Sequence, residues 1–216
     1  MKFCACAATL ALLTACGGSG TDMTPAVPTR AQLGTDINAI LGDLNRIDDL
    51  APTSTANMPT SGSSTFNGGA LVIASRGNVE YNLIGDSSLT VNFANDSMSG
   101  QASNFRGFTG SGTLIAAPGQ LTYSGGQIGI GGDANAFSLS YNGALNAGGD
   151  RLAMRGNATG FFSGNRTAGQ VRTRAVQGVS GTVGSITDNL PGGTPNMTAT
   201  VNGAPAVADF TLYGEN

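Results

Sequence analysis

Apolar residues occupy every second position in several stretches of this chain. The alternating positions are Val79, Tyr81 and Leu83, then Leu89, Val91 and Phe93, then Phe137, Leu139 and Tyr141, and finally Leu152 and Met154. Successive side chains of an extended strand point to opposite faces, so a period of two gathers the apolar residues of one stretch on one face. Each stretch therefore predicts a half-buried β-strand.

Turn-forming residues separate the predicted strands at short intervals. The turn signals are Arg76-Gly77-Asn78, Gly85-Asp86-Ser87, Asn95-Asp96, Pro118-Gly119, Gly131-Gly132-Asp133, Gly148-Gly149-Asp150 and Asn202-Gly203. Strands joined by such short turns form hairpins and run antiparallel. About eight to ten strands of this kind make either a sandwich or an up-and-down barrel.

Glycines inside the predicted strands favour the barrel. Gly100, Gly125 and Gly160 are such glycines, and a small closed barrel needs the bends that glycine allows. We therefore expect a mainly β fold, in which residues 62–216 form a single antiparallel up-and-down β-barrel of about eight strands.

A helical period replaces the alternation in residues 30–50. The apolar residues Leu33, Ile37, Ile40, Leu41, Leu44 and Ile47 fall on one face of a helix. Thr29 and Gln32 have the spacing of a capping box, and Pro52 follows the predicted end. Gly34 and Gly42 each weaken the helix by about 1 kcal/mol relative to alanine, so its apolar face needs a docking surface.

We expect this amphipathic helix to pack across one end of the barrel. Its four aspartates would then face water; they are Asp36, Asp43, Asp48 and Asp49. The alternative is a helix that binds a partner or a second copy of the chain.

The first apolar run of the chain ends at a cysteine. After Met1 and Lys2, residues 3–13 are mostly apolar, and Leu13-Thr14-Ala15-Cys16 closes the run. The run is shorter than the about 20 residues of a transmembrane helix and predicts a cleaved export signal in residues 1–15. Its ending resembles the lipobox of bacterial lipoproteins. That resemblance implies a diacylglycerol on the Cys16 thiol, cleavage before Cys16 and acylation, as by palmitate, of the new amino terminus. The alternatives are an ordinary secretory signal and an intracellular amphipathic segment.

Two stretches without periodicity flank the helix. Residues 16–29 predict a flexible tether, and residues 51–61 predict a linker. A flexible coil over residues 17–29 has an end-to-end distance of about 20 Å, which lifts a domain clear of lipid headgroups.

The composition excludes several kinds of chemistry. The chain has no histidine, and its three cysteines are Cys4, Cys6 and Cys16, which fall in or next to the export signal. The folded part therefore lacks the commonest general base, a thiol nucleophile, disulfides and thiolate metal ligands. Without Lys2, nine arginines face thirteen acidic residues, which argues against a nucleic-acid partner. We expect no enzyme activity and no cofactor, and we interpret the glycine-rich run Gly129-Ile130-Gly131-Gly132-Asp133-Ala134 as a hairpin turn.

Three motifs behind the lipobox resemble one family. They are Met58-Pro59-Thr60-Ser61-Gly62-Ser63-Ser64-Thr65-Phe66-Asn67-Gly68, then Leu89-Thr90-Val91-Asn92-Phe93 followed by Met98-Ser99-Gly100, and Gly160-Phe161-Phe162-Ser163-Gly164. In this order they resemble the barrel domains of transferrin-binding protein B and related surface lipoproteins, over residues 58–181. The resemblance implies a lipid-anchored outer-membrane barrel that presents loops to a protein or to a small iron-related ligand.

The chain departs from this family in two places. Ala168-Gly169-Gln170 lacks the family's glutamate, and the chain continues past the family's last strand. We expect the additional tail to close the barrel in place of the usual strand. One barrel stands here instead of the paired lobes of transferrin receptors, so transferrin binding itself is not implied.

Five of the nine arginines fall between Arg151 and Arg174. By strand alternation, Arg151 and Arg155 share one face and Arg172 and Arg174 share another, and both pairs should point outward. Outward arginines favour a patch that meets an acidic partner or lipid phosphate. The alternative is a solvated barrel wall, whose arginines discourage edge pairing.

These patterns predict a lipid-anchored outer-membrane binding module, with Cys16 as the lipid-attachment residue. The alternative is a structural envelope lipoprotein without a small ligand. A membrane-spanning barrel is disfavoured, because a lipid anchor would be redundant and aromatic residues, at 6%, are few for two interfacial girdles.

Overall fold

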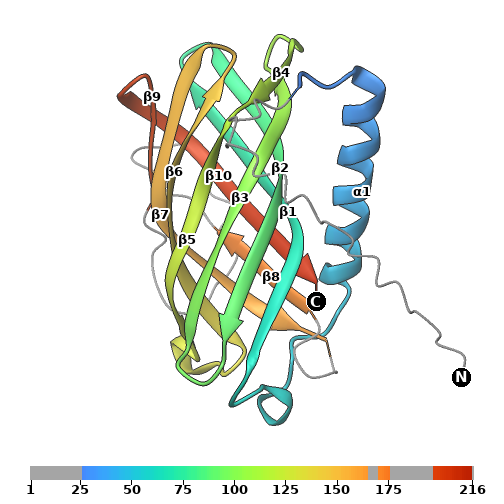
Figure 1. Cartoon of the computed structure of the whole chain (residues 1–216), viewed down its shortest axis with the longest axis vertical. Coiled ribbons are helices and arrows are strands. Elements are labelled where there is room, and N and C mark those ends of the chain that lie inside the picture. Colours follow the sequence, from blue (N-terminus) through green and yellow to red (C-terminus); the bar gives the residue numbers. More distant parts are fainter. Residues whose placement is uncertain (1–25, 165–169, 176–196, 216) are drawn as a thin grey trace, which may run out of the picture.

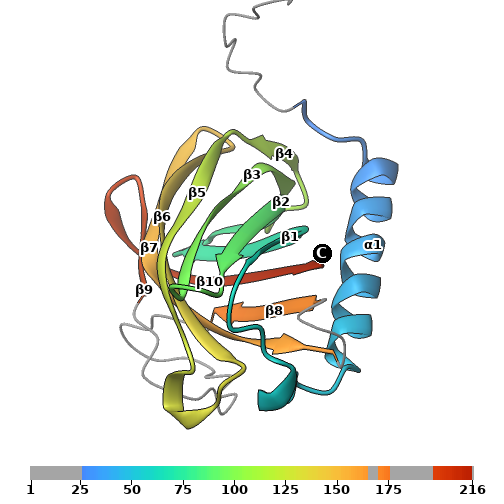
Figure 2. The same cartoon turned by 60° about the horizontal axis from the view of Figure 1, so that its bottom comes forward.

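The computed structural model describes residues 26–164, 170–175 and 197–215, which form a β-barrel with one helix on its outside (Figures 1 and 2). The helix is α1 (Arg30–Asp48), and two short 3-10 helices are η1 (Thr55–Asn57) and η2 (Ile130–Gly132). The strands are β1 (Ser63–Arg76), β2 (Val79–Asn92), β3 (Ser97–Thr109), β4 (Leu114–Ala117), β5 (Gly119–Ile128), β6 (Ala136–Ala147), β7 (Asp150–Ser163), β8 (Gln170–Ala175), β9 (Met197–Val201) and β10 (Ala204–Glu215).

Eight strands close into a ring. Their order is β1-β2-β3-β5-β6-β7-β8-β10, and β10 pairs with β1, for example at Ala70 and Leu212. All of these neighbours run antiparallel. The predicted antiparallel up-and-down barrel of about eight strands is confirmed. The part of the tail that forms β10 closes it, as expected.

The remaining two strands extend strands of the ring. β4 and β5 both pair with β3, at neighbouring parts of that strand. β8 and β9 both pair with β7 and with β10. Along β7, Arg174 of β8 lies opposite Thr159 and Met197 of β9 lies opposite Gly156. β8 and β9 therefore occupy successive parts of one strand position between β7 and β10.

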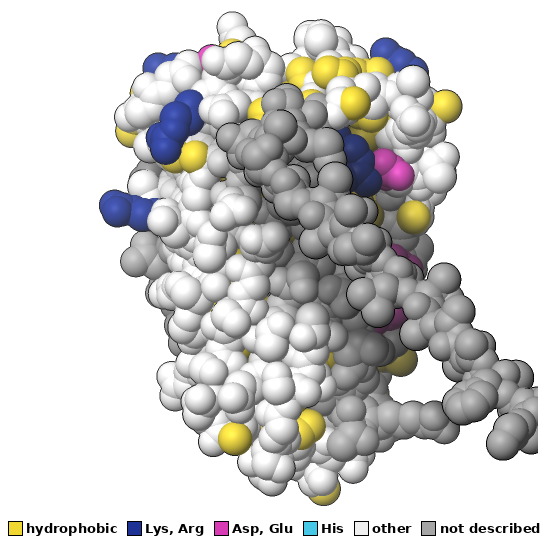
Figure 3. Space-filling model, in the orientation of Figure 1, with side chains coloured by type: hydrophobic (Ala, Val, Ile, Leu, Met, Phe, Trp, Pro, Cys, Tyr) yellow, Lys and Arg dark blue, Asp and Glu magenta, His cyan; other side chains and the backbone are white. Residues whose placement is uncertain are grey.

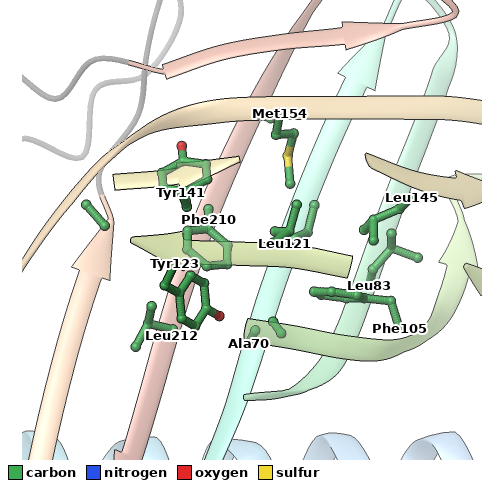
Figure 4. Packing of buried hydrophobic residues seen from close by; sticks show 14 of the residues in the cluster. Ala70, Leu83, Phe105, Leu121, Tyr123, Tyr141, Leu145, Met154, Phe210 and Leu212 are labelled. Carbon is green, nitrogen blue, oxygen red and sulfur yellow. The ribbon is translucent and has the colours of Figure 1, made fainter. Parts of the chain in front are cut away.

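The inside of the barrel is filled by one continuous hydrophobic cluster (Figure 4). Aromatic rings form two groups in it. Phe210 lies 4.7 Å from Tyr141 and 6.1 Å from Tyr123, ring centre to ring centre. Phe162 lies nearer one end of the barrel, 4.9 Å from Phe137 and 5.5 Å from Phe93. The interior of the described barrel is thus occupied by its own side chains.

Two of the predicted turns are wrong. Gly85-Asp86-Ser87 lies within β2, where the pairing with β3 shifts register between Ile84 and Asp86. A Cβ at Gly85 would lie 2.7 Å from the ring of Phe105, so this glycine makes room for an aromatic side chain rather than for a turn. Pro118 separates β4 from β5 without a hairpin. Proline cannot donate to a ladder and so interrupts the strand.

The helix begins as predicted and lies elsewhere than predicted. Both hydrogen bonds of the Thr29–Gln32 capping box are present, and α1 ends at Asp48 rather than at residue 50. α1 lies along the outer wall of the barrel, so the expected position across one end is wrong (Figures 1 and 2). Its buried residues and those of the wall are Leu33, Ile40, Ile47, Ile84 and Tyr213, with Ile37, Leu44, Leu71, Phe108 and Leu114 partly buried around them. The wall carries apolar residues at outward positions, which alternation alone does not reveal.

Salt bridges hold α1 against the wall. Asp36 accepts a hydrogen bond from Nε of Arg106 at 2.7 Å, and Arg46 binds Glu215 and Asp43. Asp36 and Asp43 are therefore paired rather than simply solvated, whereas Asp49 is exposed. The side chain of Asp48 lies outside the described part of the chain.

Part of the expected linker is docked on the barrel. The backbone N–H of Thr53 donates to Phe162 at 2.9 Å, its hydroxyl donates to Gly164 at 3.0 Å, and Gly164 donates back to Ala51 at 2.8 Å. Met58 packs against the interior cluster. We call this the lower end of the barrel and the end with the β1–β2, β3–β4, β6–β7 and β9–β10 turns the upper end, as in Figure 1.

Candidate functional site

Arg151 and Arg155 lie on the outer face of β7, near its upper end. Both are exposed, while Leu152 and Met154 between them are buried in the interior cluster. Ala153, the third outward position, separates the two arginines. The two guanidinium groups therefore stand on either side of a small side chain.

Arg172 and Arg174 lie on β8, toward the lower end. They pair with Phe161 and Thr159 of β7, respectively, and their side chains lie outside the described part of the structure. Arg155 is four residues from Thr159 along β7, which is about 13 Å at strand spacing. The strand register thus places the four predicted arginines in two pairs of positions at different levels of β7.

A groove of about 370 Å³ lies beside the first pair, where β6, β7 and β9 meet. Its lining residues are Asn142, Gly143, Ala144, Arg151, Ala153, Met154, Arg155, Thr198 and Thr200. Small side chains at its centre leave the hollow, and longer ones border it. On the face that Figure 3 shows, the dark-blue basic side chains all lie in the upper half of the molecule.

The lining of this groove suits a negatively charged ligand. Among the described residues, neither Arg151 nor Arg155 forms a salt bridge, so both guanidinium forks are available for bidentate contacts to carboxylate or phosphate. Asn142, Thr198 and Thr200 add amide and hydroxyl groups that donate and accept. The groove can therefore recognise both charge and shape.

A hydrogen-bond network at the upper rim fixes the start of β7. The hydroxyl of Tyr81 donates to one carboxylate oxygen of Asp150, and the Asn202 amide donates to the other at 2.6 Å. The backbone N–H of Arg151 donates to the side-chain oxygen Oδ1 of Asn202 at 2.9 Å. This network orders the strand that carries Arg151.

The network shifts the pKa values of its acidic groups. The hydrogen bonds from Tyr81 and then Asn202 lower the pKa of the Asp150 carboxyl, because they stabilise its charged form. Burial, with the hydrogen bond to Asp150, raises the pKa of Tyr81 to about 12. The sequence pattern predicts Asp150 and Asn202 as turn residues. Their pairing with Tyr81 depends on barrel closure, which no local signal reports.

The other sequence motifs acquire structural explanations. Gly129 has φ of 79° and begins η2 between β5 and β6, so the glycine-rich run is a hairpin connection as predicted. Asp133 lies in this connection at the lower end and Asp150 lies at the upper rim, so the two carboxylates do not form a pair. Within residues 26–164, 170–175 and 197–215, no cluster of three potential metal-ligating His, Cys, Asp or Glu side chains occurs. The described part of the chain also contains no helix that is both long and apolar enough to span a membrane.

Comparison with known proteins finds no relative of this chain. No protein-family model, no curated protein and no solved structure matches it. The resemblance to transferrin-binding protein B therefore stays a hypothesis carried by the sequence motifs, and the groove has to be interpreted from its own chemistry.

Proposed function

We propose that the protein is a lipid-anchored outer-membrane binding module that captures a negatively charged partner on its barrel wall. The observation that carries this proposal is the contrast between a filled interior and the wall groove, whose two arginines form no salt bridge with another described residue. A barrel whose interior is occupied by its own aromatic side chains must bind at its surface. The proposal assigns no catalytic step to any residue.

The membrane anchor in this proposal rests on Cys16. An apolar run of export-signal length precedes it, and small residues stand immediately before it. Two or more acyl chains give stable anchoring, whereas one chain gives only marginal binding. The folded part then stands on residues 16–29 as a tether.

The ligand class follows from the groove. Two arginines flanking hydroxyl and amide groups fit carboxylates or phosphates, whether on an acidic protein surface or on a small anionic ligand. A small iron-related ligand, as the family resemblance implies, belongs to this class when its exposed groups are anionic.

Affinity capture with the acylated full-length chain tests this function. We expect anionic partners to be retained by the wild type and lost, with at least tenfold weaker retention, when Arg151→Gln and Arg155→Gln are combined, since two charge-assisted contacts disappear. The matched control combines Arg172→Gln and Arg174→Gln, which removes the same charge from β8. Equal loss in both double variants would show that net charge, not the groove, governs capture.

The anchor has its own test. A Cys16→Ser chain should leave the membrane fraction, and mass spectrometry of the wild type should show a diacylglyceryl group on Cys16. A Cys16→Ser chain that still fractionates with membranes would contradict the anchoring.

A further inference from the structure

We infer that the upper end of the barrel rests on the anionic surface of the bilayer in which the chain is anchored. This inference deepens the proposed function and rests on its lipid anchor. The contact surface, which we call the docking end, consists of Val27, Arg30, Ile73, Arg76, Val79 and Val207. Its occupant is a layer of anionic lipid headgroups.

Exposed apolar side chains gather at this end. Of the five large hydrophobic residues that the described structure exposes, only Leu41 lies elsewhere; Val27 is 60% exposed and Ile73, Val79 and Val207 are 42–45% exposed. Val79 is directly paired with Arg76 at the β1–β2 turn, and Val207 is paired with Ser75 next to it. Figure 3 shows hydrophobic side chains concentrated at the top of the molecule.

Cationic side chains accompany them. Arg30 begins α1 and Arg76 ends β1, both are exposed, and neither has a salt bridge within the described residues. Exposed apolar side chains beside arginines are the combination that binds the interface of an anionic bilayer. Arg151 and the groove lie on the adjacent wall, where they stay accessible.

Acidic groups also lie at this end: Asp209 pairs with Ile73 across β1 and β10, and Glu80 and Asp150 are held by hydrogen bonds. Glu80 accepts a hydrogen bond from the Asn82 amide at 2.8 Å, and Asp150 accepts from Tyr81 and Asn202. At the lower end, the β2–β3 turn carries Asp96 and the β5–β6 connection carries Asp133, both exposed. What distinguishes the upper end is that its exposed valines and isoleucine stand beside Arg30 and Arg76, whereas these two lower turns present exposed acidic side chains.

The path of the chain points the same way. Val27 is eleven residues beyond Cys16, so the two are at most about 40 Å apart even when the chain is fully extended. Because α1 starts at the upper end, the tether delivers that end, rather than the acidic turns, to the membrane surface.

Fluorescent labels at the two ends test the orientation. The acylated full-length chain has no free thiol after signal removal, so Asn78→Cys in the β1–β2 turn and Ala94→Cys in the β2–β3 turn each accept one label. The protein is reconstituted in vesicles of phosphatidylcholine, with or without phosphatidylglycerol, that carry a headgroup-bound quencher. We expect quenching at position 78 to exceed that at position 94 about fivefold in anionic vesicles, and less in neutral vesicles or high salt.

Charge variants make the test specific. Each arginine near an anionic surface strengthens contact about fivefold, so Arg30→Gln with Arg76→Gln should lower the docked-to-undocked ratio about 25-fold. Arg172→Gln with Arg174→Gln is the matched control and should leave the ratio within about twofold of the wild type, because the docking end keeps its arginines.

Several results would overturn the inference. These are equal quenching at both positions, stronger quenching at position 94, indifference to lipid charge, or a cross-linked dimer with position 78 protected but unquenched. All of them apply to acylated, membrane-anchored protein, so they are distinct from failure of the anchor, which the mass of Cys16 and the Cys16→Ser chain report.

Discussion

The barrel wall buries apolar side chains on both faces, but the two faces are organised differently. The inner face contributes to one cluster with residues from strands around the ring. On the outer face, Ile84 and Tyr213 are buried together with three residues of a single helix, and salt bridges lie beside them. Loss of an inner contact affects many strands at once. Loss of an outer contact affects mainly α1. The comparison indicates that the closed ring is the stable unit and that α1 is an attachment to it.

The largest expected effect comes from the centre of the inner cluster. Phe210→Ala should lower the free energy of unfolding by about 3–5 kcal/mol, because Phe210 is fully buried between Tyr123 and Tyr141 and truncation leaves a cavity. Urea unfolding measures the change. Phe161→Ala, at a half-buried outward position of β7, is the control and should cost about 1 kcal/mol. Similar losses in both variants would remove the distinction between the two faces.

Ile47→Ala tests the outer cluster. Ile47 is a residue of α1 that is fully buried in the outer cluster, and its truncation should destabilise the docked helix by about 2 kcal/mol. Hydrogen exchange should accelerate in α1 amides while the strand amides keep their protection. Leu41→Ala, at a position 47% exposed, should change neither. If strand amides exchange faster by the same factor as helix amides, α1 belongs to the cooperative unit of the barrel.

Glycine-to-alanine substitutions should have opposite effects on stability in the barrel wall and in α1. A Cβ at Gly100 would lie 2.1 Å from the carbonyl oxygen of Ser88, so Gly100→Ala should cost about 1–3 kcal/mol through backbone displacement. Gly34→Ala in α1 meets no atom within 4 Å and should stabilise the helix by up to about 1 kcal/mol. Thermal unfolding should show a lower melting temperature for Gly100→Ala, and hydrogen exchange should show slower exchange of the α1 amides for Gly34→Ala. Tolerance of Gly100→Ala would mean that the wall can relax at this point.

The smallest effect is a pH dependence. All four tyrosines have raised pKa values: burial first, with nearby carboxylates, raises those of Tyr81 and Tyr213 to about 12, and burial raises those of Tyr123 and Tyr141 further. A folded-state pKa above the ordinary 10.0 contributes stability that is complete below pH 10 and is lost as pH rises through 12.

Tyrosinate absorbance checks this prediction. No tyrosine of the native protein should ionise near pH 10, and Ile47→Ala should lower only the pKa of Tyr213, because only that ring lies under α1. Titration of any tyrosine at its ordinary pKa would contradict the burial assigned to it. An unchanged Tyr213 in the Ile47→Ala protein would show that α1 does not shield it.

The sequence predicted the features that repeat along the chain. Alternation found the inward residues from Tyr81 to Met154, and the Thr29–Gln32 spacing found the start of α1. Prediction from the sequence failed at residues whose role depends on a contact with a residue distant in the chain. Gly85 is a glycine because Phe105 lies against it, and the position of α1 depends on outward apolar residues such as Ile84 and Tyr213.

The candidate site shows the same division. Strand alternation placed Arg151 and Arg155 on the outside, where both are exposed. It could not show that β9 comes to lie beside Arg155, nor that β8 carries Arg172 and Arg174 to another level of β7. The split of this strand position into β8 and β9 involves pairings between distant parts of the chain, so local patterns do not contain it.

The pairing of β1 with β10 has a consequence for how the protein is made. Asn67 of β1 pairs with Glu215 of β10, so the first strand of the ring stays unpaired on one side until the last strand has formed. Every folding intermediate before that point presents an unpaired strand edge. Contacts this distant along the chain form slowly. The ring cannot close until β10 is present, and a chain truncated before β10 lacks the strand that closes it. Closure of the barrel therefore depends on the chain having been synthesised through β10.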